Sequence, residues 1–269
     1  MKVAISRSSS ILGASDTGPV TPAPSMAPVT LKHPCSASVA CVIPVYNHEQ
    51  RIEEVIRAAM KLGLPIIVVD DGSTDSTPDI LKRIPDITVL RHLENQGKGA
   101  ALLTGFAAAV ELGCDMAITL DADGQHQPED AENLLRAVPD MLRPIVIGKR
   151  QGMNGENVPW TSRYGRKFSN FWVWLSGGPL VSDSQSGFRL YPLPEALDLD
   201  VQARRFQFEV EILVAAHRQG IPVLEAPVQV VYQKGAERIS HFRPWKDFFR
   251  NSVTFSRLIW RRIFSGGRQ

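Results

Sequence analysis

Asp121 and Asp123 are the residues whose type and spacing point most directly to chemistry. They follow residues 116–120, an apolar run that predicts a short buried strand. Residues i and i+2 of an extended segment point the same way, so both carboxylates would face one spot beyond the strand. Two like charges held together are costly without a cation, and carboxylate oxygens favour Mg²⁺ or Mn²⁺. We predict a divalent-metal site here, to which Gln125 adds an oxygen; a solvated turn is the alternative.

Acidic side chains also follow the apolar run at 66–69. Asp70 and Asp71 begin the sequence Asp-Asp-Gly-Ser-Thr-Asp, and a carboxylate there can accept hydrogen bonds from a base imide or a ribose hydroxyl. We expect both aspartates to contact a ligand. Ser73 and Asp75 are instead expected to turn the chain and to cap the next helix.

A glycine-rich segment, Asn-Gln-Gly-Lys-Gly at 95–99, follows the next expected strand. It lacks the spacing of a Walker A motif, which excludes a P-loop NTPase. Gly97 and Gly99 are expected to let the backbone approach a nucleotide closely. Lys98 either neutralises a phosphate or remains solvated.

The elements that would position these loops alternate along the chain. Apolar runs predict strands at 39–43, 66–69, 88–90, 116–120 and 145–147, and helical periodicity predicts helices at 49–62, 75–83, 99–112 and 128–138. Such alternation indicates an α/β fold with a mostly parallel sheet and helices on both faces. Ligands of such sheets bind beyond the carboxyl ends of the strands, where the polar loops lie.

Composition narrows the functional class. The chain has 269 residues, 43% apolar and 22% charged, with a net charge of +2, so it is globular and has no overall field that would favour nucleic acid. The three cysteines match no zinc or disulfide spacing. No apolar run reaches the roughly 18 residues of a membrane span, and no secretory signal is evident. Residues 1–38, rich in Ser, Pro, Ala and Thr, predict a disordered tail.

The loops at 44–47, 70–75, 95–99 and 121–125, in this order, resemble the family 2 glycosyltransferases with the GT-A fold. Residues 183–191, Asp-Ser-Gln-Ser-Gly-Phe-Arg-Leu-Tyr, resemble the corresponding segment of the dolichol- and polyprenol-phosphate sugar transferases, as do 206–211 and 225–231. The resemblance spans about 39–242 and implies a GT-A domain at 39–241. It also implies metal-dependent, inverting transfer of a sugar from a UDP- or GDP-sugar.

The resemblance further implies which residues hold the donor. The base and ribose would contact the loops after the first two strands, and Asp121, Asp123 and Gln125 would hold the metal and the donor phosphates. The expected donor-binding residues are Pro44, Tyr46, Asn47, Asp70, Asp71, Gly97, Lys98, Arg189 and Arg238. Arg238 and His241 are expected to replace a closing Gly-x-Ser-Lys segment of the family, and His48 followed by Glu49 departs from an acidic residue that the family often has there.

The same resemblance places the acceptor near Arg150 and Arg163, which would grip its phosphate, with Ser186 and Arg189 lining the cavity. Arginine suits this task because it stays charged and pairs bidentately with phosphate. A solvated basic helix face is the alternative for Arg163.

Three functions remain open at this point. A phosphate acceptor is already anionic and needs mainly positioning, whereas a hydroxyl acceptor needs a general base, for which Asp183 is the candidate. The first function is transfer to a polyprenyl phosphate or related lipid, the second is transfer to a hydroxyl of a glycan or lipid, and the third is a non-catalytic scaffold. An oxidoreductase is disfavoured, because no Gly-x-Gly-x-x-Gly follows the first strand.

The last segment, 242–269, combines aromatic residues at helical spacing with many arginines. It predicts an amphipathic helix that lies on an anionic membrane surface or, alternatively, packs on the domain. Residues 168–175 hold a second aromatic cluster. We therefore expect a cytoplasmic protein attached peripherally to the inner face of the membrane.

Overall fold

The structure, a computed structural model, describes residues 4–6, 38–152 and 160–230 together with the helical residues 252, 254–260 and 262. Side chains are described from 38 to 152 and from 165 to 230, and at those C-terminal helical residues. Within the expected tail, Ala4–Ser6 forms strand β1, which the sequence analysis did not anticipate. The other residues of 1–37 lie outside the described part, so their disorder stays a prediction.

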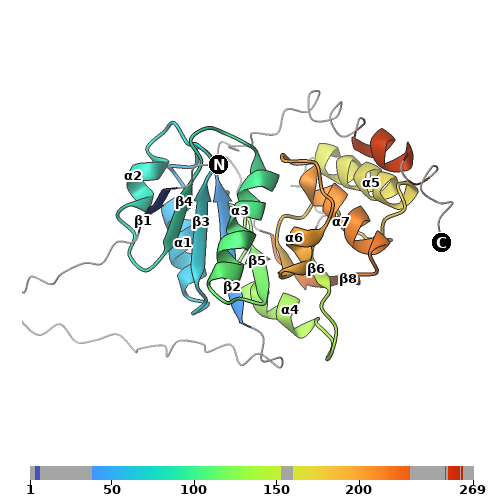
Figure 1. Cartoon of the computed structure of the whole chain (residues 1–269), viewed down its shortest axis with the longest axis horizontal. Coiled ribbons are helices and arrows are strands. Elements are labelled where there is room, and N and C mark those ends of the chain that lie inside the picture. Colours follow the sequence, from blue (N-terminus) through green and yellow to red (C-terminus); the bar gives the residue numbers. More distant parts are fainter. Residues whose placement is uncertain are drawn as a thin grey trace, which may run out of the picture.

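One mixed sheet forms the centre of the described chain (Figure 1), with the strand order β1-β4-β3-β2-β5-β7-β6-β8. Strands β4, β3, β2 and β5 run parallel, as do β6 and β8, whereas β7 is antiparallel to both of its neighbours. This arrangement confirms the expected α/β fold with a mostly parallel sheet. The strand bounds are Val39–Val45 (β2), Ile66–Asp70 (β3), Thr88–Arg91 (β4), Met116–Thr119 (β5), Ile145–Arg150 (β6), Arg189–Pro192 (β7) and Val223–Val228 (β8).

Helices cover both faces of the sheet, as expected for strands that are apolar throughout. On one face pack α1 (Ile52–Met60), α2 (Thr77–Leu81) and α4 (Ala131–Arg136), which follows the short 3-10 turn Pro128–Asp130. The opposite face is covered by α3 (Lys98–Glu111), α6 (Glu195–Asp198) and α7 (Phe208–Arg218).

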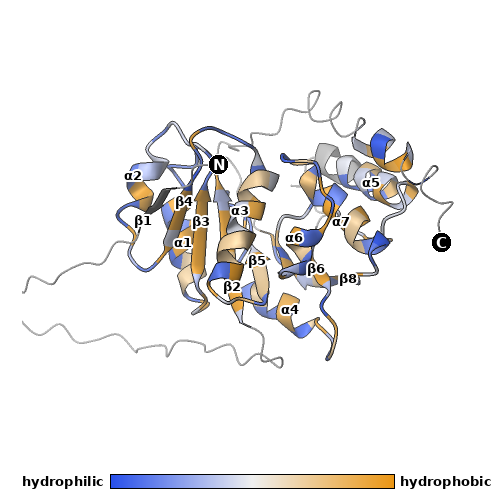
Figure 2. Ribbon diagram, in the orientation of Figure 1, coloured by the Kyte–Doolittle hydropathy of each residue, from blue (hydrophilic) through white to orange (hydrophobic). Residues whose placement is uncertain are grey.

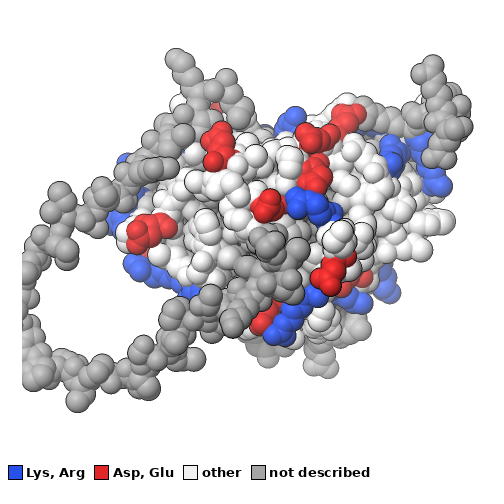
Figure 3. All heavy atoms as spheres, turned by 60° about the horizontal axis from the view of Figure 1, so that its bottom comes forward, with Lys and Arg blue, Asp and Glu red and all other residues white. Residues whose placement is uncertain are grey.

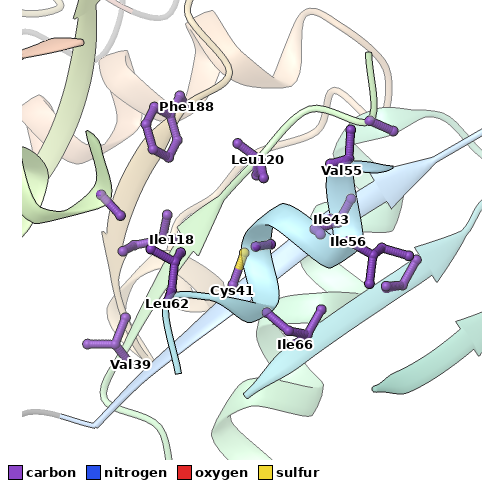
Figure 4. Close-up of a cluster of buried hydrophobic side chains, with 14 of the residues drawn as sticks. Val39, Cys41, Ile43, Val55, Ile56, Leu62, Ile66, Ile118, Leu120 and Phe188 are labelled. Atoms are coloured by element: carbon purple, nitrogen blue, oxygen red, sulfur yellow. The ribbon is translucent and has the colours of Figure 1, made fainter. Parts of the chain in front are cut away.

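Two apolar cores result, one on each face of the sheet. Alternate residues of each strand point to opposite faces, so Cys41 and Ile43 of β2 enter the core under α1, while Ala40 and Val42 enter the core under α3. Figure 4 shows the first core, where side chains of α1 meet those of β2, β3 and β5. Figure 2 shows the same strands as the most hydrophobic part of the ribbon.

The insertion of β7 is the main departure from simple alternation. This strand lies between β5 and β6. It pairs Thr119 with Arg189 on one side and Ile147 with Arg189 on the other. The loop that precedes β7, residues 183–188, is thereby brought to the carboxyl end of β5.

Helix α5 (Trp160–Leu175) and the C-terminal helical residues form a third, smaller cluster. Phe255 and Leu258 are buried against Val210 and Val214 of α7, and the ring of Phe255 stacks on Trp172 with centroids 5.9 Å apart. This portion of the expected amphipathic helix therefore packs on the domain.

Charged side chains are interspersed on the surface drawn in Figure 3. Acidic and basic groups lie beside one another on this face, and the described residues form no continuous basic track there. A continuous basic track is what a nucleic acid backbone requires.

Gly105 of α3 tests how closely this helix must approach the sheet. A Cβ at this position would lie 2.4 Å from Cγ1 of Val42, so Gly105→Ala forces the helix away from β2. We expect the free energy of unfolding to fall by about 1–3 kcal/mol, measured by urea denaturation.

The matched control is Gly165→Ala in α5, where the nearest atom to the added Cβ is 3.9 Å away. Alanine favours helix over glycine, so this variant should be neutral or more stable. Equal loss of stability in both variants would contradict the packing described.

Candidate functional site

Asp121 lies just beyond β5 and is the centre of a charged cluster. The ammonium of Lys98, the first residue of α3, lies 2.6 Å from Oδ1 of Asp121 and 2.5 Å from Oε1 of Glu209 on α7. Burial alone would raise the pKa of Asp121, but the charge of Lys98 outweighs it and holds that pKa below its ordinary value. Asp121 is therefore an ionised carboxylate whose charge the protein already balances in part.

Asp123, two residues further on, has the opposite shift. Burial and then the nearby charge of Asp121 raise the pKa of Asp123, while the backbone N–H of Gln125 donates to its Oδ1 over 3.0 Å. The two carboxylates thus interact electrostatically, as the spacing of the sequence predicts. A divalent cation between them would relieve this repulsion.

These residues fit a hard cation that takes part of its coordination from a ligand. Among the described residues no group of three or more His, Cys, Asp or Glu side chains could enclose a metal ion. Mg²⁺ commonly uses one or two carboxylates and completes its shell with substrate phosphates and water. Asp121 and Asp123 offer such a partial shell, and the contribution of the Gln125 side chain stays a prediction.

The loops after β2 and β3 are clamped together by side chains. Asn47 adopts a left-handed φ of 53°. Its side-chain Oδ1 accepts from the N–H of Thr74 over 2.8 Å, and its own backbone N–H donates to Ser73 Oγ over 3.0 Å. Pro44 is buried within β2, and Tyr46 is half-buried directly beyond it. Asn47 therefore shapes this edge of the site, and its contact with a donor stays a prediction.

The carboxylate of Asp71 forms hydrogen bonds within the protein. Its Oδ2 accepts from the N–H of Gly97 at 2.7 Å, and its Oδ1 accepts from the N–H of Gln96 at 2.9 Å and lies 2.7 Å from Nδ1 of the buried His92. Both oxygens of this buried carboxylate are occupied, so the geometry gives Asp71 the role of anchoring the 95–97 loop, where the sequence predicted ligand contact.

Asp70 is also buried, but its two oxygens differ. Oδ1 accepts from the N–H of Ser73 at 2.8 Å. Oδ2 lies 3.2 Å from Nε of Arg91, within ion-pair distance but without the geometry of a hydrogen bond. Asp70 thus retains acceptor capacity for a ligand, although its side chain is almost fully covered by protein.

Gly97 and Gly99 allow close contact with residues 204–208 of the protein, whereas the sequence analysis predicted close contact with a nucleotide. Gly97 has a φ of 106°, and a Cβ there would lie 2.4 Å from the carbonyl oxygen of Arg204. A Cβ on Gly99 would lie 2.5 Å from Cβ of Phe208. Because neighbouring protein fills the space, these glycines seat the loop on residues 204–208, and the expectation that they make room for a nucleotide is corrected.

On the acceptor side, the structure brings Arg150 and Asp183 together. The end of β6 places the Arg150 guanidinium against the carboxylate, with Nε–Oδ2 and Nη2–Oδ1 both 2.7 Å. Glu225 of β8 holds the same loop, because its Oε1 accepts from the N–H groups of Ser182 at 2.7 Å and Asp183 at 3.1 Å. Asp183 is fully buried, so it orients Arg150 and is poorly placed to act as a general base.

Arg189 is bonded to the protein itself and has no exposed surface. Its guanidinium is fully buried in β7 and donates to the carbonyl oxygens of Ser184, Ser186 and Glu209 at 2.7–2.8 Å. This residue therefore orders the loop that precedes β7, and the donor-binding role predicted for it is corrected.

Three residues named in the sequence analysis lie wholly or partly outside the described part of the chain. Arg163 belongs to α5, but its side chain lies outside the described part, and so does the whole of Arg238. The same holds for His241. Their predicted roles stay predictions.

Three residues at the site were missed by the sequence analysis. Glu225 is the one charged residue of β8, and Glu209 lies among apolar residues in the first turn of α7; an acid in such surroundings was the available signal. His126 follows the aspartate pair, and its ring lies 5.3 Å from that of Phe188. Burial lowers the pKa of His126 to about 4, so its imidazole is neutral.

Residues 40–193 match the family described as Glycosyl transferase family 2. The chain is 32% identical over 212 residues to the UDP-N-acetylglucosamine–dolichyl-phosphate N-acetylglucosaminyltransferase of Methanococcus voltae, covering 71% of this chain and 84% of the relative. It is 30% identical to the undecaprenyl-phosphate mannosyltransferase of Micrococcus luteus, covering 74% and 86% of the two chains.

Among solved structures, the chain is similar to glucosyl-3-phosphoglycerate synthase from Mycobacterium tuberculosis in complex with Mg²⁺ and uridine diphosphate. The TM-score is 0.63 at 20% identity, with 84% of this chain and 79% of that chain covered. At this identity the likeness concerns the fold, and it matches the GT-A architecture expected from the sequence.

The anchoring role of Asp71 predicts a stability effect in the absence of any ligand. Asp71→Asn replaces one acceptor oxygen with a donor, which leaves one buried N–H unpaired. We expect a loss of about 1–3 kcal/mol in the free energy of unfolding, measured by denaturant titration.

Glu53→Gln, in an exposed ion pair with Arg57 on α1, is the control and should leave stability nearly unchanged. If Asp71→Asn is as stable as the wild type but loses nucleotide binding, Asp71 is a ligand contact and the anchoring role is wrong.

Proposed function

The chain belongs to glycosyl transferase family 2, and we propose that it transfers a sugar from a nucleotide-diphosphate sugar to a polyprenyl phosphate. The acceptor class is supported by the relatives in Methanococcus voltae and Micrococcus luteus, whose names specify dolichyl phosphate and undecaprenyl phosphate. The observation that carries the proposal from the structure is the pairing of Arg150 with a buried Asp183.

The donor half of the site is built on Asp121 and Asp123. These residues would hold Mg²⁺ or Mn²⁺, which, when bound, neutralises charge on the departing nucleoside diphosphate. Lys98 carries a further positive charge next to Asp121, and Asp70 supplies a buried acceptor at the end of β3. The base of the donor, uridine or guanosine, and its sugar are not specified by these contacts.

The acceptor half depends on Arg150. Its bidentate pairing with Asp183 fixes the guanidinium plane at the end of β6, and a fixed arginine suits a phosphate ligand. Inverting transfer by direct displacement needs a nucleophile opposite the leaving group. A phosphate oxygen is already negatively charged, so the protein has to position it and need not remove a proton.

A hydroxyl acceptor fits the geometry less well. It requires a general base within hydrogen-bond reach of the nucleophile. Asp183, the candidate from the sequence, is fully buried with both oxygens bonded to Arg150. This engagement favours the phosphate acceptor.

The direct test is a transfer assay with radiolabelled UDP- and GDP-sugars, offered polyprenyl phosphate or the corresponding polyprenol with Mg²⁺ or Mn²⁺. We expect product only with the phosphate, and we expect Asp123→Asn to lower the rate at least about 100-fold because a metal ligand is lost. Product would be quantified as lipid-extractable label.

Asp86→Asn serves as the matched control, because Asp86 is exposed and has a φ of 59° that asparagine tolerates. Its rate should equal that of the wild type. Transfer to polyprenol instead would establish the hydroxyl acceptor, and no transfer by any combination, with the Asp123 variant unchanged in nucleotide binding, would favour the scaffold.

We also propose that the protein meets its lipid acceptor while bound to the membrane surface. None of the helices in the described residues has the length and apolar content to cross a bilayer. Phe168, Phe171 and Trp174 are nevertheless exposed along one face of α5, with Lys167 beside them. Leu180 and Trp260 are exposed nearby in the chain segments that adjoin α5. Aromatic side chains with adjacent cations suit the headgroup region of an anionic membrane.

Vesicle binding tests this surface. The double variant Phe171→Gln/Trp174→Gln should bind vesicles of phosphatidylglycerol and phosphatidylcholine at least about tenfold more weakly in a sedimentation assay, since it removes two apolar groups from the contact. The control is Leu93→Gln/Met141→Gln, which alters two apolar residues elsewhere on the domain that are more exposed than Phe171 and Trp174. An equal loss in the control, or no loss in the α5 variant, would exclude this face as the membrane contact.

A further inference from the structure

Lys98 forms ion pairs with two carboxylates, and one of them belongs to the expected metal ligand Asp121. Its ammonium lies between two carboxylates that are far apart in the sequence, 2.6 Å from Asp121 Oδ1 and 2.5 Å from Glu209 Oε1. All three side chains are largely covered, with 16%, 25% and 9% of their surfaces exposed for Lys98, Asp121 and Glu209. An ion pair at this depth is less screened by water than a surface pair.

The surroundings hold this cluster in place. A Cβ on Gly187 would lie 2.4 Å from Asp121 Oδ2 and 2.6 Å from Lys98 Nζ, so the ion pair packs directly on the backbone of the loop before β7. The carbonyl oxygen of Gly187 accepts from Thr119 Oγ1 at 2.7 Å, and that of Glu209 accepts from Arg189 at 2.7 Å. The positions of these charged side chains are therefore fixed by the packing and hydrogen bonds around them.

The ammonium and a metal ion would compete for the same carboxylate. Oδ1 of Asp121 is bonded to Lys98, whereas a cation shared by Asp121 and Asp123 needs that carboxylate as a ligand. Burial would lower the pKa of Lys98, but Asp121 and Glu209 outweigh it and hold that pKa above its ordinary value, so the lysine remains charged. A metal on Asp121 would therefore share one carboxylate with an ammonium, and the repulsion between the two positive charges would disfavour the metal while Lys98 stays in place.

We propose that Lys98 is a resident counter-ion that holds Asp121 until the donor arrives and so couples metal binding to nucleotide binding. The inference rests on the metal site of the proposed function. In the absence of nucleotide, Lys98 keeps the metal affinity low. When the diphosphate enters, its negative charge draws the ammonium from Asp121 and frees the carboxylate for the metal. Glu209 is the positioning residue that keeps Lys98 at the site in both states.

The proposed coupling predicts how tightly the metal binds in the absence of nucleotide. Lys98→Met frees Asp121, so Mn²⁺ in the absence of nucleotide should bind roughly tenfold more tightly than to the wild type, within the usual range of coupling between two ligands. The factor by which UDP or GDP tightens Mn²⁺ binding should fall by a similar amount. Electron paramagnetic resonance of free Mn²⁺ measures both affinities without any catalytic turnover.

A second variant tests whether Lys98 competes with the metal or acts only through the net charge of the cluster. It also avoids the loss of stability that the single variant can cause. Lys98→Met leaves Glu209 buried without its cation, which can lower stability. Lys98→Met/Glu209→Gln removes one positive and one negative charge, so the net charge of the cluster is unchanged while Asp121 is still freed. Mn²⁺ alone should again bind more tightly than to the wild type.

Lys149→Met, at an exposed lysine of β6, is the matched control and should leave Mn²⁺ affinity unchanged. If the wild type binds Mn²⁺ with UDP or GDP and both Lys98 variants bind Mn²⁺ alone no more tightly than the wild type, the counter-ion role is wrong and the proposed function stands. If no form binds Mn²⁺ even with either nucleotide, the metal site itself is refuted and the inference fails with it.

Discussion

The cost of burying acidic side chains is the constraint on which the site depends. The carboxyl edge of the sheet gathers Asp71, Asp121, Asp183 and Glu209, and each is largely withdrawn from water. A buried carboxylate is tolerated only with hydrogen-bond donors or a cation beside it. Asp71 is satisfied by backbone N–H groups and His92, Asp121 and Glu209 by Lys98, and Asp183 by Arg150. The pKa of Asp123 is raised by burial and by the charge of Asp121, so a cation added beside this carboxylate would stabilise the site.

This constraint also explains why the antiparallel strand β7 matters to the chemistry. By inserting between β5 and β6, it brings Gly187 against Asp121 and carries Asp183 to Arg150 at the end of β6. The proposed donor and acceptor halves are thus joined by one loop, residues 183–188, which is held by Glu225 on one side and Arg189 on the other. A shift of that loop would disturb both halves together, so the order within the loop is as important to transfer as the charged groups themselves.

Much of the fold could be predicted from the sequence, because buried parallel strands are continuous apolar runs and helices show their own period. The strands at 39–43, 66–69, 88–90, 116–120 and 145–147 are confirmed, as is the place of Asp121 and Asp123 at a strand end.

The roles of individual polar residues were harder to predict from the sequence. Gly97 and Arg189 were assigned to the donor because their types suit phosphate, but Arg204 and the backbone of the 184–186 loop occupy their surroundings. Such contacts join residues distant in the sequence, and a local pattern cannot reveal them. Glu209, 111 residues from Lys98, is the clearest example.

The central claim is that Asp121 and Asp123 together hold the cation of the donor diphosphate. The most direct measurement is a crystal structure with Mn²⁺ and UDP or GDP, with diffraction data collected at the manganese absorption edge. The account predicts one anomalous peak in coordination contact with both carboxylates and the diphosphate, and a Lys98 ammonium that has left Asp121. A nucleotide bound with Lys98 still on Asp121, and no manganese between the two aspartates, would contradict it.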